Sequence, residues 1–301
     1  MSMQDTPHIF NRQAKKLHRN RCTKSYTAHN FLVQECAKRL IDRLLDIRKK
    51  FPQALDLGCH SGDLSENLGR YTGIQHLIQA DLSPEMAALA SRHGPSLAAD
   101  EEWLPFKPNC FDLVLSNLSL HWINDLPGTF VQIRQTLNDD GLFLSSMLGG
   151  ETLRELRHAL MTAELELENG ASARISPFAD VKDLGNLLSR AGFALPVSDT
   201  EIITVNYQDP FRLLTDLRGM GESNAVHLRK KSFMRRQTLM RAMEIYREQF
   251  GNPDGTCPAT FEVITLTAWK PHASQQQPLK PGSGKIDLAS VIATDDQDPA
   301  I

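Results

Sequence analysis

The chain has 301 residues, a hydrophobic content of 41% and a formal net charge of −3. This composition is typical of a soluble globular protein, and the charge gives no reason to expect a nucleic-acid partner. We find no apolar run of about 18 residues and no N-terminal signal core, so we expect a cytoplasmic protein without a membrane span. The five cysteines form no CxxC pair, which favours a reducing compartment over a disulfide framework, and we expect no metal.

The N-terminal 50 residues are predicted to be a basic arm followed by a helix. Residues 8–24 are locally rich in Lys, Arg and His, which is typical of a solvated arm without a specific binding role. Residues 29–50 carry apolar side chains at helical spacing and are predicted to form an amphipathic helix. We therefore expect the main domain to begin near residue 51.

Strands and helices are predicted to alternate over residues 51–150. The expected strands are 54–58, 76–83, 96–100, 111–120 and 142–147. Ser83-Pro84 is a suitable helix start, and a second helix over 126–137 is predicted to end at the turn signal "NDDG". This alternation indicates an α/β fold with a mostly parallel sheet.

The second half of the chain has a different pattern. We predict a helix over 151–167 with a capping box at Thr152 and Glu155, and another over 180–193 that stops at Gly192. Residues 201–207 and 259–269 are predicted strands, so the helical stretch at about 210–250 is an insertion if they pair. The main domain is therefore placed at 51–270, and 271–301 is predicted to be a disordered tail.

The segment "DLGCHSG" follows the first predicted strand. Gly58 and Gly62 would let the backbone approach a ligand closely, and the next helix N-terminus could help to hold an anionic group. Asp56 precedes the loop and could brace it or attract a cation. His60 stands where such loops commonly carry a middle glycine, and the segment alone could be a simple turn.

Two acids follow the next strands. Asp81 ends the second strand, where a carboxylate can accept hydrogen bonds from a ribose diol and would repel a 2′-phosphate. Its alternative role is to cap the helix that begins at Ser83-Pro84. Asp100 follows the third strand, where it could accept from an adenine amino group or be a solvated turn residue.

Polar residues also follow the strand at 111–120. Asn117, Ser119, His121 and Trp122 come where α/β sheets place their ligand crevice. His121 could act as a general base, although a single His beside a Trp is more often a packed residue.

Together these features resemble the class I S-adenosylmethionine-dependent methyltransferases. The resemblance is carried by "DLGCHSG", Asp81, "DEEWLPF" and "FDLVLSNLSLHWINDL". It implies a Rossmann-like fold with a mostly parallel seven-stranded sheet, helices on both faces, and S-adenosyl-L-methionine as cofactor. The implied cofactor-binding residues are Asp56, Gly58, Gly62, Asp81, Leu82, Asp100, Glu101 and Asn117. His60 departs from the family's glycine pattern.

Two narrower groups are also similar. "SNLSLHWINDLP" resembles biotin-pathway malonyl-carrier-protein methyltransferases. "FNRQAKKLHRNR", "MLGGETLRELR", "DLRGMGESN" and "GTCPATFEVITLTAWK" resemble bacterial relatives of a mitochondrial complex I assembly factor known for hydroxylating arginine. Over residues 8–270 this implies His121 as the catalytic candidate and Trp122, Glu222 and Asn224 on the substrate side.

Three functions are compatible with this sequence. The first is methyl transfer to a small carboxylate, a carrier-protein thioester or a protein side chain. The second is hydroxylation of an arginine in a respiratory complex I subunit. The third is a non-catalytic assembly chaperone that keeps the cofactor and grips a partner through its basic arm. The acid in "GMGESN" could engage a guanidinium, although this segment could also be a helix-breaking loop.

Overall fold

The computed structural model describes residues 8–69, 72–168, 170–276 and 282–283. Met1–Pro271 forms one compact unit, and His272–Ile301 is a second unit. The predicted tail at 271–301 lies largely outside the described residues. Within the described part of the chain, no helix combines the length and apolar character that a membrane crossing needs.

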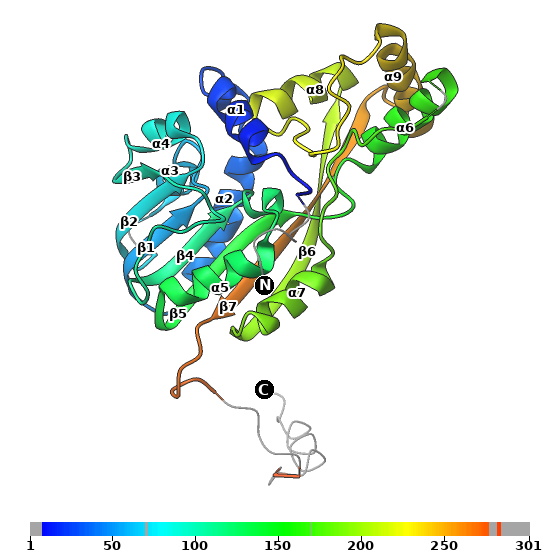
Figure 1. Ribbon diagram of the computed structural model, residues 1–301. Helices are drawn as coiled ribbons and strands as arrows, with labels where there is room; N and C mark the ends of the chain where they lie inside the picture. Colours follow the sequence, from blue (N-terminus) through cyan, green and yellow to red (C-terminus); the bar gives the residue numbers. More distant parts are fainter. Residues whose placement is uncertain (1–7, 70–71, 169, 277–281, 284–301) are drawn as a thin grey trace, which may run out of the picture. The chain divides into compact units, whose positions relative to one another are not determined.

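A seven-stranded sheet organises the first unit, with strand order β3-β2-β1-β4-β5-β7-β6 (Figure 1). The first five strands pair in parallel, and β7 pairs antiparallel with both β5 and β6. Their bounds are β1 Phe51–Leu57, β2 Ile74–Asp81, β3 Ser96–Ala98, β4 Phe111–Asn117, β5 Leu137–Leu148, β6 Ala194–Tyr207 and β7 Cys257–Trp269. The predicted Rossmann-like, mostly parallel sheet is confirmed.

Helices cover both faces of this sheet. Successive residues of a strand point to opposite faces, and in β4 Leu113 packs with α2 (Phe31–Leu45) while Val114 packs with the opposite layer. That opposite layer contains α5 (Leu126–Thr136) and α7 (Val181–Arg190). Burial on both faces explains why the centre of this strand, residues 113–115, is apolar without alternation.

The remaining helices are short or lie beyond the sheet. They are α1 (Arg12–Cys22), α3 (Asp63–Asn67), α4 (Pro84–Ala90), α6 (Arg154–Glu168), α8 (Pro210–Gly219) and α9 (Arg236–Phe250), with 3₁₀ turns η1 (Tyr26–Ala28) and η2 (Leu120–Trp122). Along the chain, α8 and α9 come between β6 and β7, and these two strands pair with each other. The predicted helical insertion is therefore confirmed. With α6 and β7 they share one apolar cluster (Figure 1).

Two local predictions differ from the structure. Thr152 and Glu155 do not form a capping box, because both side chains bind β7 instead. The Thr152 hydroxyl donates to the Glu262 carbonyl at 3.2 Å, and Glu155 accepts from Thr260. The "NDDG" segment does follow the end of α5, but it lies within β5, where Asp140 has a φ of +59°.

The basic N-terminal segment is not a solvated arm. Residues 12–22 form α1, whose Lys15 and Arg19 side chains are fully buried. The segment before α1 pairs with the insertion through a bridge between Phe10 and Val226. Buried acids on other elements hold these cations, and the charge pattern of residues 8–24 alone could not reveal such partners.

Candidate functional site

The loop after β1 carries two glycines in left-handed conformations. Gly58 has a φ of +76° and Gly62 a φ of +92°, which side chains rarely adopt. A Cβ at Gly58 would lie 2.1 Å from the Ser119 hydroxyl, so only glycine allows this approach. Gly62 is the N-cap of α3 and packs against Gln79 and His93. The loop therefore brings bare backbone to the carboxyl end of the sheet.

His60 is a buried, neutral part of this loop. Its ring donates from Nε2 to the Asn117 carbonyl at 3.1 Å and stacks on Tyr26 with ring centroids 6.1 Å apart. Burial and then the nearby Arg19 charge lower the pKa of His60 to about 3. The ring is therefore uncharged and faces protein groups on both sides.

Asp81 collects three donors at the end of β2. Its carboxylate accepts from the backbone N–H of His60 at 3.0 Å and of Ser83 at 2.8 Å. Arg19 Nη1 lies 2.9 Å from the same Oδ2 that the His60 N–H binds. Ser83 is the N-cap of α4, as predicted, so Asp81 supports both the loop and the start of this helix. The acceptor expected for a ribose is thus present and bound by a side chain from α1.

Glu101 is the second buried acid of this region. It pairs with Arg12, accepts from Ser119 at 2.8 Å and lies 3.2 Å from Arg19. Burial opposes its ionisation, but Arg12 and Arg19 outweigh that effect and lower the pKa of Glu101 to about 2. Asp100 is partly exposed and lies 2.5 Å from Arg12. Glu101 is therefore charged, and both carboxylates are already paired with Arg12 of α1.

The other cofactor candidates have varied surroundings. Leu82 and Asp100 line an open pocket of about 270 Å³ together with Ala98, Ala99 and residues of α1. Asp56 is fully buried, and its carboxylate oxygens have no hydrogen-bond partner in the described residues. Burial, then Asp63 and Asp81, raises the pKa of Asp56 well above its usual value.

Asn117 supports the sheet edge. Its amide donates to the Val33 carbonyl at 2.8 Å, and its side-chain oxygen accepts from Ser146 at 2.7 Å. Both ends of the side chain are therefore bonded to protein. The Asn117 carbonyl accepts the hydrogen bond from the His60 ring and so ties the loop after β1 to the end of β4.

The predicted substrate-side residues meet around one carboxylate. Glu222 accepts from Trp122 Nε1 at 2.7 Å and lies 3.3 Å from His121 Nε2. Lys15 Nζ donates to Glu222 at 2.5 Å and to the Gly221 carbonyl at 3.0 Å, and it lies 4.4 Å from the centre of the Trp122 ring. This is a cation held by a carboxylate and an aromatic face.

The protonation states of this cluster follow from burial and charge. Burial alone would raise the pKa of Glu222, but Lys15 and His121 outweigh it and hold that pKa well below its usual value. Burial lowers the pKa of Lys15 to about 8 and also lowers the pKa of His121. His121 is therefore neutral near pH 7, and its Nδ1 has no partner among the described residues.

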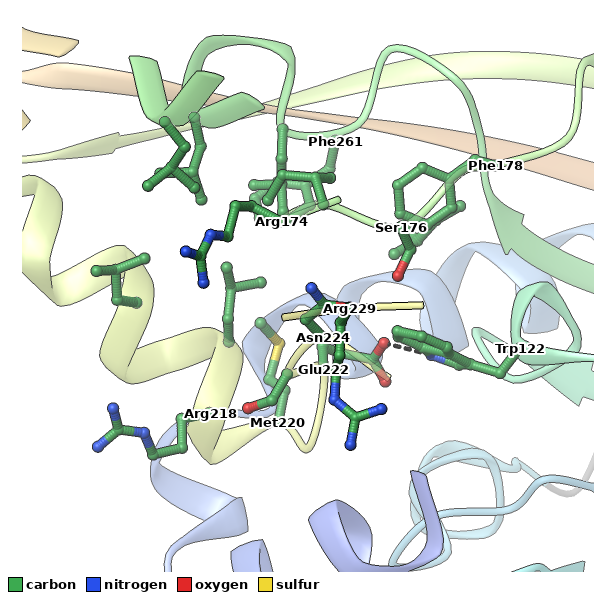
Figure 2. A pocket seen from close by; sticks show the side chains of 18 of the residues that line it. Trp122, Arg174, Ser176, Phe178, Arg218, Met220, Glu222, Asn224, Arg229 and Phe261 are labelled. Carbon is green, nitrogen blue, oxygen red and sulfur yellow. Dashed lines mark hydrogen bonds between the residues drawn. The ribbon is translucent and has the colours of Figure 1, made fainter. Parts of the chain in front are cut away.

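A cavity of about 430 Å³ opens beside this cluster. Its walls include Trp122, Phe178, Met220, Glu222 and Phe261, and apolar side chains dominate the lining. Figure 2 shows Glu222 and Trp122 joined by their hydrogen bond, with Arg174, Arg218 and Arg229 around the same space. Such a concave, mostly apolar space with a few polar groups is the usual form of a ligand site.

Asn224 has a supporting position at this cavity. Its amide donates to the Ala173 carbonyl at 2.7 Å, and its side-chain oxygen accepts from the Val226 N–H at 2.9 Å. It therefore ties the 222–226 segment to the loop before α7. No group of three or more His, Cys, Asp or Glu side chains in the described residues could hold a metal ion.

Sequence reasoning missed Arg12, Lys15 and Arg19 as members of the site. They lie three and four residues apart, which puts them on one face of α1. That spacing is visible in the sequence, but it is equally common on solvated helices. The partners that bury these cations come from residues 81, 101 and 222, far along the chain.

Comparisons with known proteins agree with this fold. A family model described as "Methyltransferase domain" matches residues 26–196. The human protein "Arginine-hydroxylase NDUFAF5, mitochondrial" is 44% identical over 95% of this chain and 84% of its own length. The zebrafish protein of the same name is 42% identical over 94% of this chain and 89% of its own. A "Malonyl-[acyl-carrier protein] O-methyltransferase" of Gallionella capsiferriformans is 32% identical over 87% of this chain and 92% of its own.

Solved structures share the fold at low sequence identity. The YcgJ protein of Bacillus subtilis superposes with a TM-score of 0.54 at 16% identity, covering 79% of this chain and 99% of its own. A protein of Bacillus halodurans C-125 described as a candidate methyltransferase gives a TM-score of 0.55 at 14% identity, covering 78% and 99%.

Proposed function

The chain belongs to the class I methyltransferase-domain family, and on this premise we propose that it uses S-adenosylmethionine to modify an arginine side chain of a protein. The family membership rests on the domain match over residues 26–196 and on relatives that are more than 30% identical over most of both chains. The protein partner is proposed to be a subunit of respiratory complex I, as the resemblance implies.

The residues at the carboxyl edge of the sheet fit S-adenosylmethionine. Gly58 lets Ser119 pack directly against the loop after β1, which a Cβ would prevent, and Asp81 is a buried acceptor at the end of β2. The pocket lined by Leu82 and Asp100 has a volume of about 270 Å³ and begins at the residue that follows Asp81 in the chain. When bound, the cofactor supplies an activated methyl group. Arg19 must release the Asp81 oxygen before a ribose hydroxyl can bind it.

One observation carries the choice of acceptor. The ionised Glu222 carboxylate already holds a cation against the Trp122 ring, in the wall of the large cavity. A guanidinium has the planar donors that pair best with a carboxylate, and it can stack on an aromatic face. A carboxylate acceptor could not take the place of this cation at Glu222, although Arg174, Arg218 and Arg229 line other walls of the cavity. The position at Glu222 and Trp122 therefore favours arginine over the small carboxylate or carrier-protein thioester.

Methyl transfer to a guanidinium requires the loss of a proton. Glu222 would hold the guanidinium by hydrogen bonds and keep one nitrogen aimed along the transfer direction. His121 is neutral and lies against Glu222, so it is the group available to accept the proton as the nitrogen gains its methyl. The mostly apolar lining of the cavity would limit the access of water to the reacting nitrogen.

Arginine hydroxylation is the second candidate for the same site. It is favoured by the names of relatives that are 42% and 44% identical over nearly the whole chain. Hydroxylation would place one oxygen atom on the side chain and needs dioxygen and a reductant. The two candidates share the acceptor and differ in the product.

The product mass separates these reactions. The purified protein is incubated in air with S-adenosylmethionine, a reductant, the complex I subunits of the same organism and a malonyl carrier protein. We expect an arginine that gains the mass of one methylene group, and a gain of one oxygen atom would establish hydroxylation instead. Mass gained only by the carrier protein would overturn the arginine assignment, and an unchanged mass everywhere would favour the non-catalytic chaperone.

A charge variant tests the acceptor site directly. Glu222→Gln keeps the side-chain size but removes the charge, so we expect arginine modification to fall by about a hundredfold while S-adenosylmethionine binding is not weakened. Glu244→Gln, on the exposed surface of α9, is the matched control and should leave turnover unchanged. Equal turnover in all three proteins would contradict a role for Glu222.

A further inference from the structure

Three cations on one face of α1 form ion pairs with the acids of both the proposed cofactor site and the proposed acceptor site. Arg19 binds Asp81 at 2.9 Å on the nucleoside side, and Lys15 binds Glu222 at 2.5 Å on the acceptor side. Arg12 pairs with Asp100 and Glu101 at the outer edge. Lys15 is 0% exposed and Arg19 is 1% exposed, so neither is a surface ion pair. One helix thus reaches every charged position that the proposed ligands would use.

Stability gives a weak reason for burying these cations. Removing two charges from water costs about as much as their attraction returns, so buried ion pairs are poor stabilisers compared with apolar packing. The apolar contacts of the α1 segment are confined to two small clusters, since Phe10 and Ala14 pack with Trp122 and Ala225, and Cys22 packs with Tyr26 and Met86. The contacts that hold α1 at the site are therefore mainly ionic. Ligands that offer equivalent donors can replace them.

The donors match the ligands in chemistry. A ribose diol donates hydrogen bonds to an acid in the position of Asp81, where Arg19 Nη1 now donates. A substrate guanidinium is a cation that would bind Glu222 and the Trp122 face, where the Lys15 ammonium now lies. Ser119 also contacts Arg19 at 2.8 Å and covers Gly58. Arg19 thus holds the position of the ribose at Asp81, and Lys15 holds the position of the substrate cation at Glu222.

We propose that α1 is an internal plug that must withdraw before the cofactor and the arginine-bearing substrate can bind. The proposal rests on the proposed function, since it takes the cofactor and the acceptor from there. Arg19 excludes the cofactor ribose, and Lys15 acts as an intramolecular competitor of the substrate cation. Withdrawal requires the ion pairs of α1 and the Phe10–Val226 bridge to open. A basic partner segment with an arginine is the occupant that replaces Lys15.

The affinity for S-adenosylmethionine tests the plug. In Arg19→Gln the competitor of the ribose is weakened, so we expect binding at least tenfold tighter by isothermal titration calorimetry. Arg21→Gln makes the same chemical change on the exposed side of α1 and should bind like the wild type. Weaker binding by Arg19→Gln would make Arg19 part of the cofactor site and would overturn the proposal.

Hydrogen exchange on the wild-type protein gives a second test that needs no variant to fold. We expect the amides of residues 12–22 to exchange faster when S-adenosylmethionine is added, because α1 loses its contacts with the site. Slower exchange on cofactor binding would mean that α1 closes over the ligand, and would overturn the plug alone. Absence of S-adenosylmethionine binding by both the wild type and Arg19→Gln would overturn the cofactor assignment itself. Neither the affinity test nor the hydrogen-exchange test measures a product. Both therefore remain decisive even if no modified acceptor is found.

Discussion

His60 explains how the loop after β1 works without a third glycine. Its φ of +51° is the backbone conformation that a glycine would adopt easily, and histidine accepts it at a cost. The ring compensates by donating to the Asn117 carbonyl and stacking on Tyr26, while the backbone N–H of His60 donates to Asp81. The side chain therefore points into the protein and leaves the backbone of the loop in place.

The buried ring makes a specific prediction about stability and pH. His60 titrates at about 3 in the folded protein and near its ordinary value of 6.5 when unfolded. Between these values the unfolded chain binds a proton that the folded chain does not, so acidification lowers the free energy of unfolding. The free energy of unfolding of the wild type should therefore exceed that of His60→Gln by less and less below pH 6.5, with the difference falling by about 1 kcal/mol per pH unit.

Urea unfolding at several pH values between 7.5 and 5 measures this slope. His76→Gln, at an exposed position of β2, is the matched control and should keep the wild-type pH dependence. An advantage of the wild type over His60→Gln that is constant with pH would mean that the buried ring takes up a proton in the folded state.

Gly58 makes a second prediction that separates backbone strain from steric overlap. Gly58 and Gly255 have similar φ values of +76° and +81°, but only at Gly58 would a new Cβ meet another atom. Gly255→Ala should cost about 1 kcal/mol of unfolding free energy from backbone strain alone. Gly58→Ala should cost about 3 kcal/mol or more, because Ser119 lies 2.1 Å from the new methyl. Equal losses in urea unfolding would show that Ser119 moves aside freely.

At the scale of elements, the sheet was predictable and the first helix was not. β4 is apolar on both faces and Asp81 ends β2, so strand pattern and motif spacing located the carboxyl edge of the sheet. Glu222 was recognised only through family resemblance, because nothing near it in sequence indicates its partners. The burial of Arg19 depends on residues 62 and 82 positions away, and such long-range pairing leaves no periodic signal in the chain.

The N-cap of α1 offers a test at this scale. The Asn11 side chain accepts from the Ala14 N–H at 2.8 Å, and losing such a cap costs about 1 kcal/mol. If α1 competes with the cofactor, Asn11→Ala should tighten S-adenosylmethionine binding by up to about fivefold. Asp180→Ala removes the equivalent cap from α7, which does not contribute to the site, and should leave that affinity unchanged. Unchanged affinity in Asn11→Ala as well would contradict competition by α1.

At the scale of the whole molecule, α1 connects two sites that otherwise lie on different parts of the chain. Asp81 belongs to the parallel sheet, and Glu222 belongs to the helical insertion between β6 and β7. Arg19 and Lys15 are one helical turn apart in an 11-residue helix, so a movement that frees one residue also displaces the other. The two ligands therefore share a single conformational step.

This shared step predicts positive coupling between the ligands. Whichever ligand binds first must displace α1, and the second then binds a site that is already open. Saturating arginine-containing peptide should tighten S-adenosylmethionine binding by at least about fivefold, and S-adenosylmethionine should tighten peptide binding by the same factor, because coupling free energies are reciprocal. Calorimetric titrations in both orders measure the two factors. In Arg19→Gln the coupling should fall, since α1 no longer opposes the cofactor as strongly, and a peptide that weakens cofactor binding would mean that the two ligands compete for one space.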